Sequence, residues 1–497
     1  MQRHTTTAAP QTGGSQADDA GKEGPPTPNT SDDGWIDSAF SSRHSIAPIP
    51  KCRLPEKEMP AHVAYQFIKD IRQLDANPRL NLASFVTTWM EPEADKLIAE
   101  ASNVNFVDME QYASCTDIHN RCLNIIANLY HAPMPEVDDP DPGRLLATGT
   151  ATIGSSEAIM LCCLALKKSW EARRKAEGKL HDKPNLVMGY NVQVVWEKFC
   201  RYWDVEPRFV PLDMTSLVMP AAGGMKLVDE NTIGVCAILG STYNGEYENV
   251  EAIDEAVEKL KAERGLYIPI HVDAASGGFV APFLQPDLKW DFRCKNVVSI
   301  NVSGHKYGLV YPGLGWAIWR SKQELPEAMW FHTAYLGSDQ PNVTLNFSKG
   351  AATIVAQYYQ FLRLGFQGYH KIMSNLMLVA KRLEISIRAT GKFTILSNDT
   401  DLPLVAFSLK RPSQPDASCA RGGPLYDEFD VSDKLRVRGW VVPAYSMAPN
   451  IQHIKLLRAV IREDMSRAMV DELAHDIRRA VEWLDIHHTE VDNEVRH

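Results

Sequence analysis

The sequence predicts an α/β fold, with a large parallel-sheet domain and a small C-terminal α+β domain. Apolar runs of strand length at 185–189, 233–239 and 297–301 alternate with helical stretches. The chain has 497 residues, of which 44% are hydrophobic, and this is enough for two cores. We expect the large domain at 127–368 and the small domain at 369–484.

The segments outside these two domains differ in composition. Residues 1–46 are rich in Thr, Gly, Pro, Ser and Asp, which predicts a disordered tail, and Asp18 and Asp19 are unlike an acid-poor transit peptide. Residues 47–126 are expected to form a partly helical N-terminal segment. The tail at 485–497 has mixed charge and lacks the basic amphipathic pattern of a calmodulin target, so we expect no calmodulin partner.

The elements of the large domain can be taken in chain order. Residues 152–158 contain a glycine turn, two serines and an early glutamate, which predicts the start of a helix over 158–175. Apolar runs at 208–212 and 267–272 predict two more strands, and 250–264 predicts another helix.

A long helix through Ala356, Leu362 and Leu376 leads into the small domain. The later elements are expected as strands at 393–396 and 405–409 and helices at 430–438 and 466–484. The Pro-, Ser- and Gly-rich stretch 412–424 is expected to be a mobile loop.

Charge and cysteine usage exclude several classes of function. The formal net charge of −10 and the lack of a basic stripe argue against nucleic acid. The nine cysteines form no C-x-x-C pair, so we expect reduced, buried thiols and no metal site. The apolar runs are too short to cross a bilayer and no signal peptide is evident, so we expect no membrane partner and a cytoplasmic location.

Lys306 is the most informative residue, because it follows the strand at 297–301 and comes directly after Ser303, Gly304 and His305. An amine at such a strand end can form a Schiff base with an aldehyde cofactor. Ser303 to Lys306 also fits the S-x-x-K pattern of serine acylases and penicillin-binding proteins, but the SDN and KTG elements of that class do not occur here.

Two further groups indicate that the cofactor is pyridoxal phosphate. Asp273 closes the strand at 267–272, and a carboxylate there can keep a pyridine nitrogen protonated. Ser155 and Ser156 lie at a helix start, where backbone N–H groups and hydroxyls bind phosphate. One parallel sheet would bring all of these groups to its carboxyl edge.

From about Lys51 to Leu484 the chain resembles the pyridoxal-phosphate-dependent glutamate decarboxylases. The resemblance is carried by the stretches NLASF, NTIGV, HVDAASGGF, SGHK and KLRVRGW. It implies the type I fold of pyridoxal phosphate enzymes, like that of aspartate aminotransferase, and the conversion of L-glutamate to 4-aminobutyrate and carbon dioxide.

The resemblance also implies the roles of individual residues around the cofactor. Lys306 attaches the cofactor and Asp273 faces its ring nitrogen. The remaining positions are the phosphate ligands Ser155, Ser156, Ser303 and His305, the ring neighbours Gln193 and Ala275, Thr242 near the phenolic oxygen, and Ser348, which reaches the phosphate of the neighbouring subunit. The role of Ser348 implies a homo-oligomer with an active site shared across a dimer; family members range from dimers to hexamers.

Five residues match the substrate pocket of the family. Ser84 and Phe85 match a Thr-Phe pair that holds the distal carboxylate, and the serine predicts a slightly roomier pocket. Asn105 and Asp108 match further pocket positions, and an Asp there helps to bind a carboxylate only if it is protonated or shares a proton. Arg458 matches an arginine that receives the α-carboxylate, although a surface ion pair is the alternative.

Three other functions stay open at this level. An aspartate decarboxylase giving β-alanine would use the same cofactor groups, and Ser84 does not exclude it. An aminotransferase would share Asp273 and Lys306. A scaffold without activity would have no need of all these groups. His305 and Lys306 are both candidates for the proton donor.

Overall fold

The structure is a computed structural model that describes residues 50–135, 146–333, 340–411 and 426–487. The predicted loop at 412–424 and the predicted tail at 1–46 lie outside these residues, as does 488–497. The chain divides into two compact units, Met1–Asp75 and Ala76–His497. Each unit is described by itself.

The described part of the first unit contains one helix, α1, Ala61–Arg72. Pro60 precedes it and fixes a backbone angle suited to a helix start, and Lys69 and Arg72 lie in the last turn, where positive charge is favourable. Tyr65 and Ile68 are exposed apolar residues of this helix.

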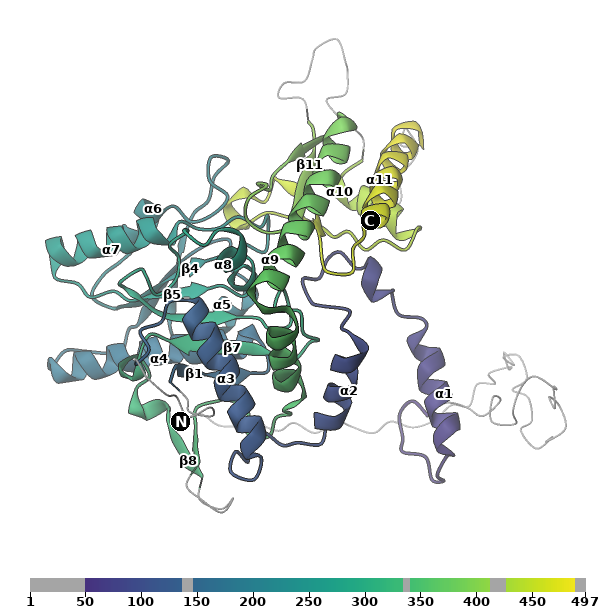
Figure 1. The fold of residues 1–497 in the computed structure, drawn as a ribbon. Helices are drawn as coiled ribbons and strands as arrows, with labels where there is room; N and C mark the ends of the chain where they lie inside the picture. Colours follow the sequence, from purple (N-terminus) through teal and green to yellow (C-terminus); the bar gives the residue numbers. More distant parts are fainter. Residues whose placement is uncertain (1–49, 136–145, 334–339, 412–425, 488–497) are drawn as a thin grey trace, which may run out of the picture. The chain divides into compact units, whose positions relative to one another are not determined.

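The second unit has the predicted α/β architecture, built on a seven-stranded sheet of order β1-β7-β6-β5-β4-β2-β3 (Figure 1). Its strands are β1 Thr148–Thr152, β2 Asn185–Gly189, β3 Glu206–Val210, β4 Thr232–Ile238, β5 Ile270–Asp273, β6 Val297–Val302 and β7 Gly315–Trp319. Strands β2 to β6 pair in parallel, as predicted. Strand β7 runs antiparallel to β1 and β6, so the sheet is mixed.

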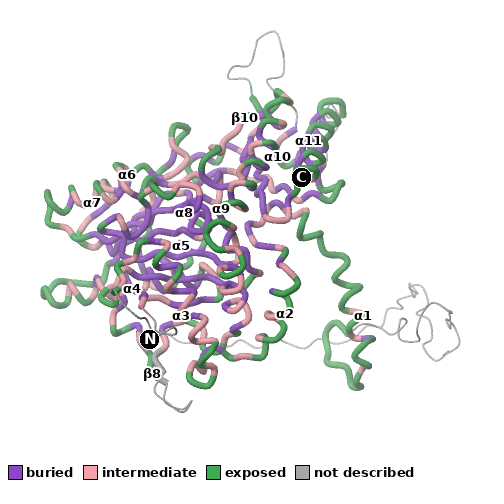
Figure 2. The backbone as a smooth tube through the Cα atoms, viewed as in Figure 1, coloured by how far each residue is buried: buried purple, intermediate pink, exposed green. Residues whose placement is uncertain are grey.

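Helices cover both faces of this sheet because its strands are apolar on both sides. The helices of this part are α3 Ala113–Leu129, α4 Ser155–Ala176, α5 Val194–Tyr202, α6 Ala221–Met225, α7 Val250–Arg264 and α8 Ala281–Leu284. Ile233 and Cys236 of β4 pack with Trp170 of α4 and Trp196 of α5. Val235 faces the opposite core, which includes residues of α3 and α7. Figure 2 shows the strands as the most buried part of the unit.

The C-terminal part forms a second, antiparallel sheet of order β10-β11-β13-β12. Its elements are β10 Phe393–Ile395, β11 Leu404–Leu409, α10 Glu428–Arg436, β12 Ala444–Ser446, β13 Lys455–Val460 and α11 Arg467–His487. A short separate sheet pairs β8, Phe331–Thr333, with β9, Gln340–Asn342.

The long helix α9, Ala352–Ala389, connects the two sheets and packs against α2, Pro92–Ala101, as well as α3 and α11 (Figure 1). It is broken at Gly365, whose φ of 56° lies in the left-handed region that glycine adopts at little cost. The domain boundaries at 127, 369 and 484 stay predictions, since no break in the second unit tests them.

Several strand ends differ from the predicted ones for local reasons. Strand β5 begins at Ile270 instead of 267, after Pro269, which has no N–H to give to a ladder. Strand β3 begins two residues early and includes Pro207, which an edge strand tolerates. Among the described residues, no helix has the length and apolar character needed to cross a membrane.

Candidate active site

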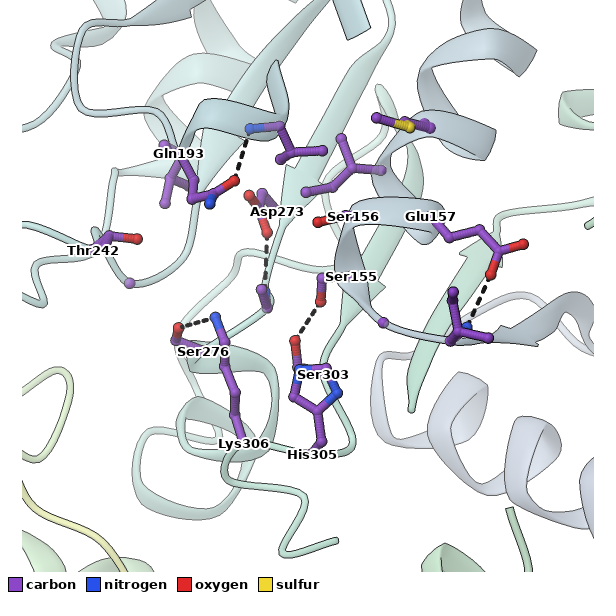
Figure 3. Close-up of a pocket in the computed structure, with 18 of the residues that line it drawn as sticks. Ser155, Ser156, Glu157, Gln193, Thr242, Asp273, Ser276, Ser303, His305 and Lys306 are labelled. Atoms are coloured by element: carbon purple, nitrogen blue, oxygen red, sulfur yellow. Dashed lines mark hydrogen bonds between the residues drawn. The ribbon is translucent and has the colours of Figure 1, made fainter. Parts of the chain in front are cut away.

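A cavity of about 560 Å³ lies at the carboxyl ends of the central strands, within the size range of small-molecule sites. Nine of the predicted cofactor residues line it together (Figure 3). These are Ser155, Ser156, Gln193, Thr242, Asp273, Ala275, Ser303, His305 and Lys306. The parallel strands thus converge on one cavity, as the order of the motifs predicts.

Lys306 follows β6 and places its amine in the cavity, where Nζ donates a hydrogen bond to Ser276 Oγ at 3.0 Å (Figure 3). Burial lowers the pKa of Lys306 to about 8, and the positive charge of Arg458 acts in the same direction, whereas Asp273 opposes the shift. A larger fraction of this amine is therefore neutral near pH 7 than of an ordinary lysine. A neutral amine is the form that can bond to an aldehyde.

Asp273 ends β5 with its carboxylate held by three donors. Oδ1 accepts from Asn301 Nδ2 at 2.9 Å and from the backbone N–H of Ala275 at 3.1 Å. Oδ2 accepts from Trp196 Nε1 at 3.1 Å. Donors on both oxygens fix the carboxylate and stabilise its negative charge inside the protein.

The opposite end of the cavity has the features of a phosphate site. Helix α4 begins at Ser155, and its unpaired N–H groups and positive dipole end face the cavity. The hydroxyls of Ser155 and Ser303 form a hydrogen bond with each other (Figure 3). Gly315 of β7 packs against the turn before α4. A Cβ added to Gly315 would lie 2.5 Å from the carbonyl carbon of Gly154, so position 315 requires glycine.

His305 is a neutral hydrogen-bond donor at the phosphate end of the cavity. Burial and the charge of Lys306 lower the pKa of His305 to about 4. The Nδ1 atom accepts from the backbone N–H of Leu314 at 3.2 Å. A neutral ring that accepts at Nδ1 carries its proton on Nε2, and this N–H can donate to a phosphate oxygen.

Gln193 and Thr242 complete the walls of the cavity. The Gln193 side chain caps α5, since its Oε1 accepts from Val195 N at 2.7 Å. The backbone carbonyl of Thr242 accepts a hydrogen bond from Arg458 Nη1. Arg458 therefore contacts the wall of the cavity although its side chain is not part of the lining.

Arg458 lies on β13 and is only 6% exposed, so the alternative of a surface ion pair is wrong. Its Nη2 donates to the carbonyl of Ala83 at 2.6 Å, and its guanidinium carbon lies 4.8 Å from the centroid of the Phe85 ring. The same ring lies 5.3 Å from Lys306 Nζ. Arg458, Phe85 and Lys306 thus form a continuous row that leads into the cavity.

Ser84 is held beside this row by its neighbours. Its hydroxyl oxygen accepts from Val86 N at 3.1 Å, and its carbonyl accepts from Arg462 Nη1 at 2.7 Å. Neither Ser84 nor Phe85 belongs to the lining of the 560 Å³ cavity.

Asn105, Asp108 and Ser348 do not line this cavity. Asn105 and Ser348 lie next to each other, with Asn105 Nδ2 3.4 Å from Ser348 Oγ, and both residues are exposed. The N–H of Asp108 donates to the carbonyl of Asn105 at 3.1 Å. The three residues therefore form a separate group.

Several residues near the site were not predicted from the sequence. Ser276 contacts the Lys306 amine, while Trp196 and Asn301 hold Asp273. Glu157 points away from the Lys306 amine (Figure 3), and its carboxylate accepts from the N–H groups of Ile153, Leu345 and Asn346 at 2.9, 2.9 and 3.2 Å. Ser276 lies close after Asp273, and Glu157 belongs to the predicted helix start, so both had a local signal. The contacts of Trp196 and Asn301 with Asp273 depend on pairing between distant segments.

This set of donors fits pyridoxal phosphate. The cavity offers an amine for the aldehyde, a carboxylate for the ring nitrogen, and a helix start with serines and a neutral histidine for the phosphate. The aldehyde, the ring nitrogen and the phosphate of the cofactor each have a counterpart of the required type.

Comparisons with known proteins agree with this fit. The conserved domain of pyridoxal-dependent decarboxylases matches residues 55–410. Glutamate decarboxylase 5 of Arabidopsis thaliana is 53% identical over 457 residues, which cover 92% of this chain and 89% of that protein. Glutamate decarboxylase of Lactococcus lactis subsp. lactis (strain IL1403) is 42% identical, over 92% of this chain and 96% of its own.

Solved structures give the same result for the fold. The glutamate decarboxylase of Lactobacillus brevis superposes with a TM-score of 0.83 at 40% identity, over 91% of this chain and 99% of that one. The structure of Oryza sativa TDC with PLP and tryptamine superposes with a TM-score of 0.70 at 17% identity, over 87% and 90% of the two chains, and shows the shared fold alone. The cofactor is pyridoxal phosphate, and the chain belongs to the family of pyridoxal-dependent decarboxylases.

Proposed function

We propose that this enzyme decarboxylates L-glutamate to 4-aminobutyrate and carbon dioxide. The observation that carries the proposal is the row formed by Arg458, Phe85 and Lys306, because it brings a buried guanidinium close to the amine that binds the cofactor. An arginine at this place can receive a substrate carboxylate. The names of the similar proteins, at 53% and 42% identity, support glutamate as the substrate.

When bound, pyridoxal phosphate supplies an aldehyde that bonds to amines and a ring that withdraws electrons from the substrate carbon. Asp273 holds a negative charge at the place proposed for the ring nitrogen. Ser155, Ser156 and the Nε2–H of His305 bind and orient the phosphate. These groups are fixed before substrate arrives, so little reorganisation is needed during the reaction.

We assign the proton that replaces carbon dioxide to Lys306 Nζ. With a pKa of about 8, this amine can both hold and release a proton near pH 7. His305, with a pKa of about 4, holds no extra proton at that pH. His305 is therefore better suited to binding phosphate.

Ser84 and Phe85 are proposed to hold the distal carboxylate of glutamate. The Ser84 hydroxyl uses an oxygen lone pair for Val86 N, which leaves its own hydrogen free to be donated. A hydroxyl that can donate suits a second carboxylate of the substrate, which supports a dicarboxylic amino acid.

We propose that the active site is completed by a second copy of the chain. Asn105, Asp108 and Ser348 gather outside the cavity of their own subunit, and Asn105 and Ser348 are exposed. Exposed polar groups in this arrangement can serve the site of a neighbouring subunit. A cytoplasmic location and independence from calmodulin stay predictions from the sequence.

The test is the release of carbon dioxide from L-glutamate and from L-aspartate by the purified enzyme with its cofactor. Faster release from glutamate, with a further loss of affinity in Arg458→Lys, is the expected result. Faster release from aspartate, with β-alanine as product, would replace the substrate. Steady formation of the pyridoxamine form of the cofactor with 2-oxoglutarate would instead identify an aminotransferase.

A further inference from the structure

A ladder of buried polar side chains runs across β5 and β6 behind Asp273. Residues two apart on a strand face the same side, so His271 and Asp273 lie on one face of β5. Ser299 and Asn301 lie opposite them on β6 in register. His271, Ser299 and Asn301 are all fully buried, with 0% exposure.

The donors and acceptors of this ladder can be assigned by starting at Asp273. Asn301 Nδ2 lies 2.9 Å from Asp273 Oδ1, and an ionised carboxylate only accepts, so the amide group of Asn301 donates there. The Oδ1 atom of Asn301 then faces His271 Nε2 at 2.8 Å. Because an amide oxygen only accepts, His271 must carry a proton on Nε2.

The outer end of the ladder fixes the second nitrogen of the ring. Burial lowers the pKa of His271 to about 4, so the ring is neutral and its Nδ1 has no proton. Nδ1 lies 2.8 Å from Ser299 Oγ and accepts the hydroxyl hydrogen.

We propose that Ser299, His271 and Asn301 form an uncharged relay, in which His271 is a positioning residue that keeps the Asp273 carboxylate oriented toward the cofactor ring nitrogen. The relay rests on the role proposed for Asp273. Every donor in it points toward the carboxylate, and none carries a charge. A charged histidine would compete with the ring nitrogen for Asp273, whereas a neutral one orients the carboxylate and leaves its charge available.

A second residue of the same type provides a matched control. His119 is also buried, at 4% exposure, and burial lowers its pKa to about 4 as well. Its hydrogen bonds run to Asn120 and to the backbone N–H of Ala151. Replacement of His119 by Phe removes a buried neutral histidine without changing the partners of Asp273.

The experiment measures the ¹⁵N NMR signal of ¹⁵N-labelled pyridoxal phosphate bound to the full chain, together with the dissociation constant of the cofactor. In His271→Phe, Asn301 loses the donor that orients it toward the Asp273 carboxylate. The ring signal is expected to move toward that of an unprotonated pyridine. The dissociation constant is expected to rise about tenfold, because the hydrogen bond from Asn301 to the charged carboxylate is lost with it. In His271→Gln the side-chain amide can donate to Asn301 again, so the signal is expected to return toward the wild-type position. His119→Phe should leave the signal unchanged.

The outcomes separate the relay from the role of Asp273. An unprotonated ring in the wild-type enzyme would overturn the role of Asp273 itself, and Asp273→Asn tests that role directly. A protonated ring that responds to Asp273→Asn but not to His271→Phe would overturn the relay. An equal response in His119→Phe would also overturn it, as a general effect of core damage. If His271→Phe does not fold, Ser299→Ala replaces it, and an unchanged signal in that variant overturns the relay.

Discussion

Arg462→Lys is expected to weaken substrate binding by loosening the segment before Phe85. Arg462 is 1% exposed, and its guanidinium donates to three backbone carbonyls of that segment. Nη1 donates to Asn81 at 2.5 Å and to Ser84 at 2.7 Å, and Nη2 donates to Pro78 at 2.9 Å. Arg462, from the C-terminal part of the chain, therefore holds three carbonyls of the segment that carries Ser84, in addition to the bond from Arg458 to Ala83.

The magnitude follows from the number of bonds that lysine cannot replace. A lysine ammonium is one nitrogen, so it cannot serve three carbonyls that are arranged around a planar guanidinium. Losing two of the three bonds, at about 1.5 kcal/mol each, lowers the free energy of unfolding by about 3 kcal/mol. If about 1 kcal/mol of this loss is expressed as weaker binding of substrate by Ser84 and Phe85, KM rises roughly fivefold.

The assay combines urea unfolding with steady-state kinetics on glutamate, and Arg320→Lys is the matched control. Arg320 also donates to three backbone carbonyls, those of Val297, Phe292 and Cys294. Its replacement is expected to lower stability without changing KM. An unchanged KM in Arg462→Lys, or an equal rise in Arg320→Lys, would refute the reasoning.

Three further predictions concern the cofactor end of the site. Lys306→Ala is expected to remove activity and the absorbance of the covalently bound cofactor. The control is Lys349→Ala, which should keep both; burial also lowers the pKa of Lys349 to about 8. Glu157→Gln should weaken cofactor binding about tenfold, because an amide N–H would then face a backbone N–H of the Leu345 segment. Fluorescence titration measures the binding, and Glu100→Gln, at an exposed position, is the control. The rate of cofactor attachment to the apoenzyme should rise with pH and level off above about pH 8, because burial lowers the pKa of Lys306 and the neutral amine then predominates. A rate that continues to rise up to about pH 10.4, as for an ordinary lysine, would contradict this prediction.

The sequence was sufficient for most of the cofactor cavity, because its residues follow strands of the main sheet. Strand β2 and helix α7 have the predicted bounds, since clear apolar runs and turn residues delimit them. Lys306 and Asp273 lie at strand ends, and parallel strands end at one edge of a sheet. Local patterns therefore predict their proximity.

Local patterns could not predict the supporting residues. Strand β13 was missed because Lys455 and Arg458 interrupt its apolar run, and strand β1 has the weakly apolar sequence TGTAT. The burial of Arg458 depends on pairing between β11 and β13 and on contacts with Ala83 and Thr242. The contact between Asn301 and Asp273 depends on strand register. Such contacts between distant segments leave no periodic signal in the chain.

The position of Arg458 on β13 places the group proposed for substrate binding far along the chain from the residues that line the cofactor cavity. All residues that line the cofactor cavity lie between Ile153 and Asn346, whereas Arg458 comes from a strand near the C-terminal end. During synthesis the groups that line the cavity leave the ribosome before the guanidinium proposed for the substrate carboxylate. A chain cut before β13 would keep every lining residue but lack that guanidinium. With the role proposed for Arg458, the enzyme can select its substrate only once its last sheet is in place.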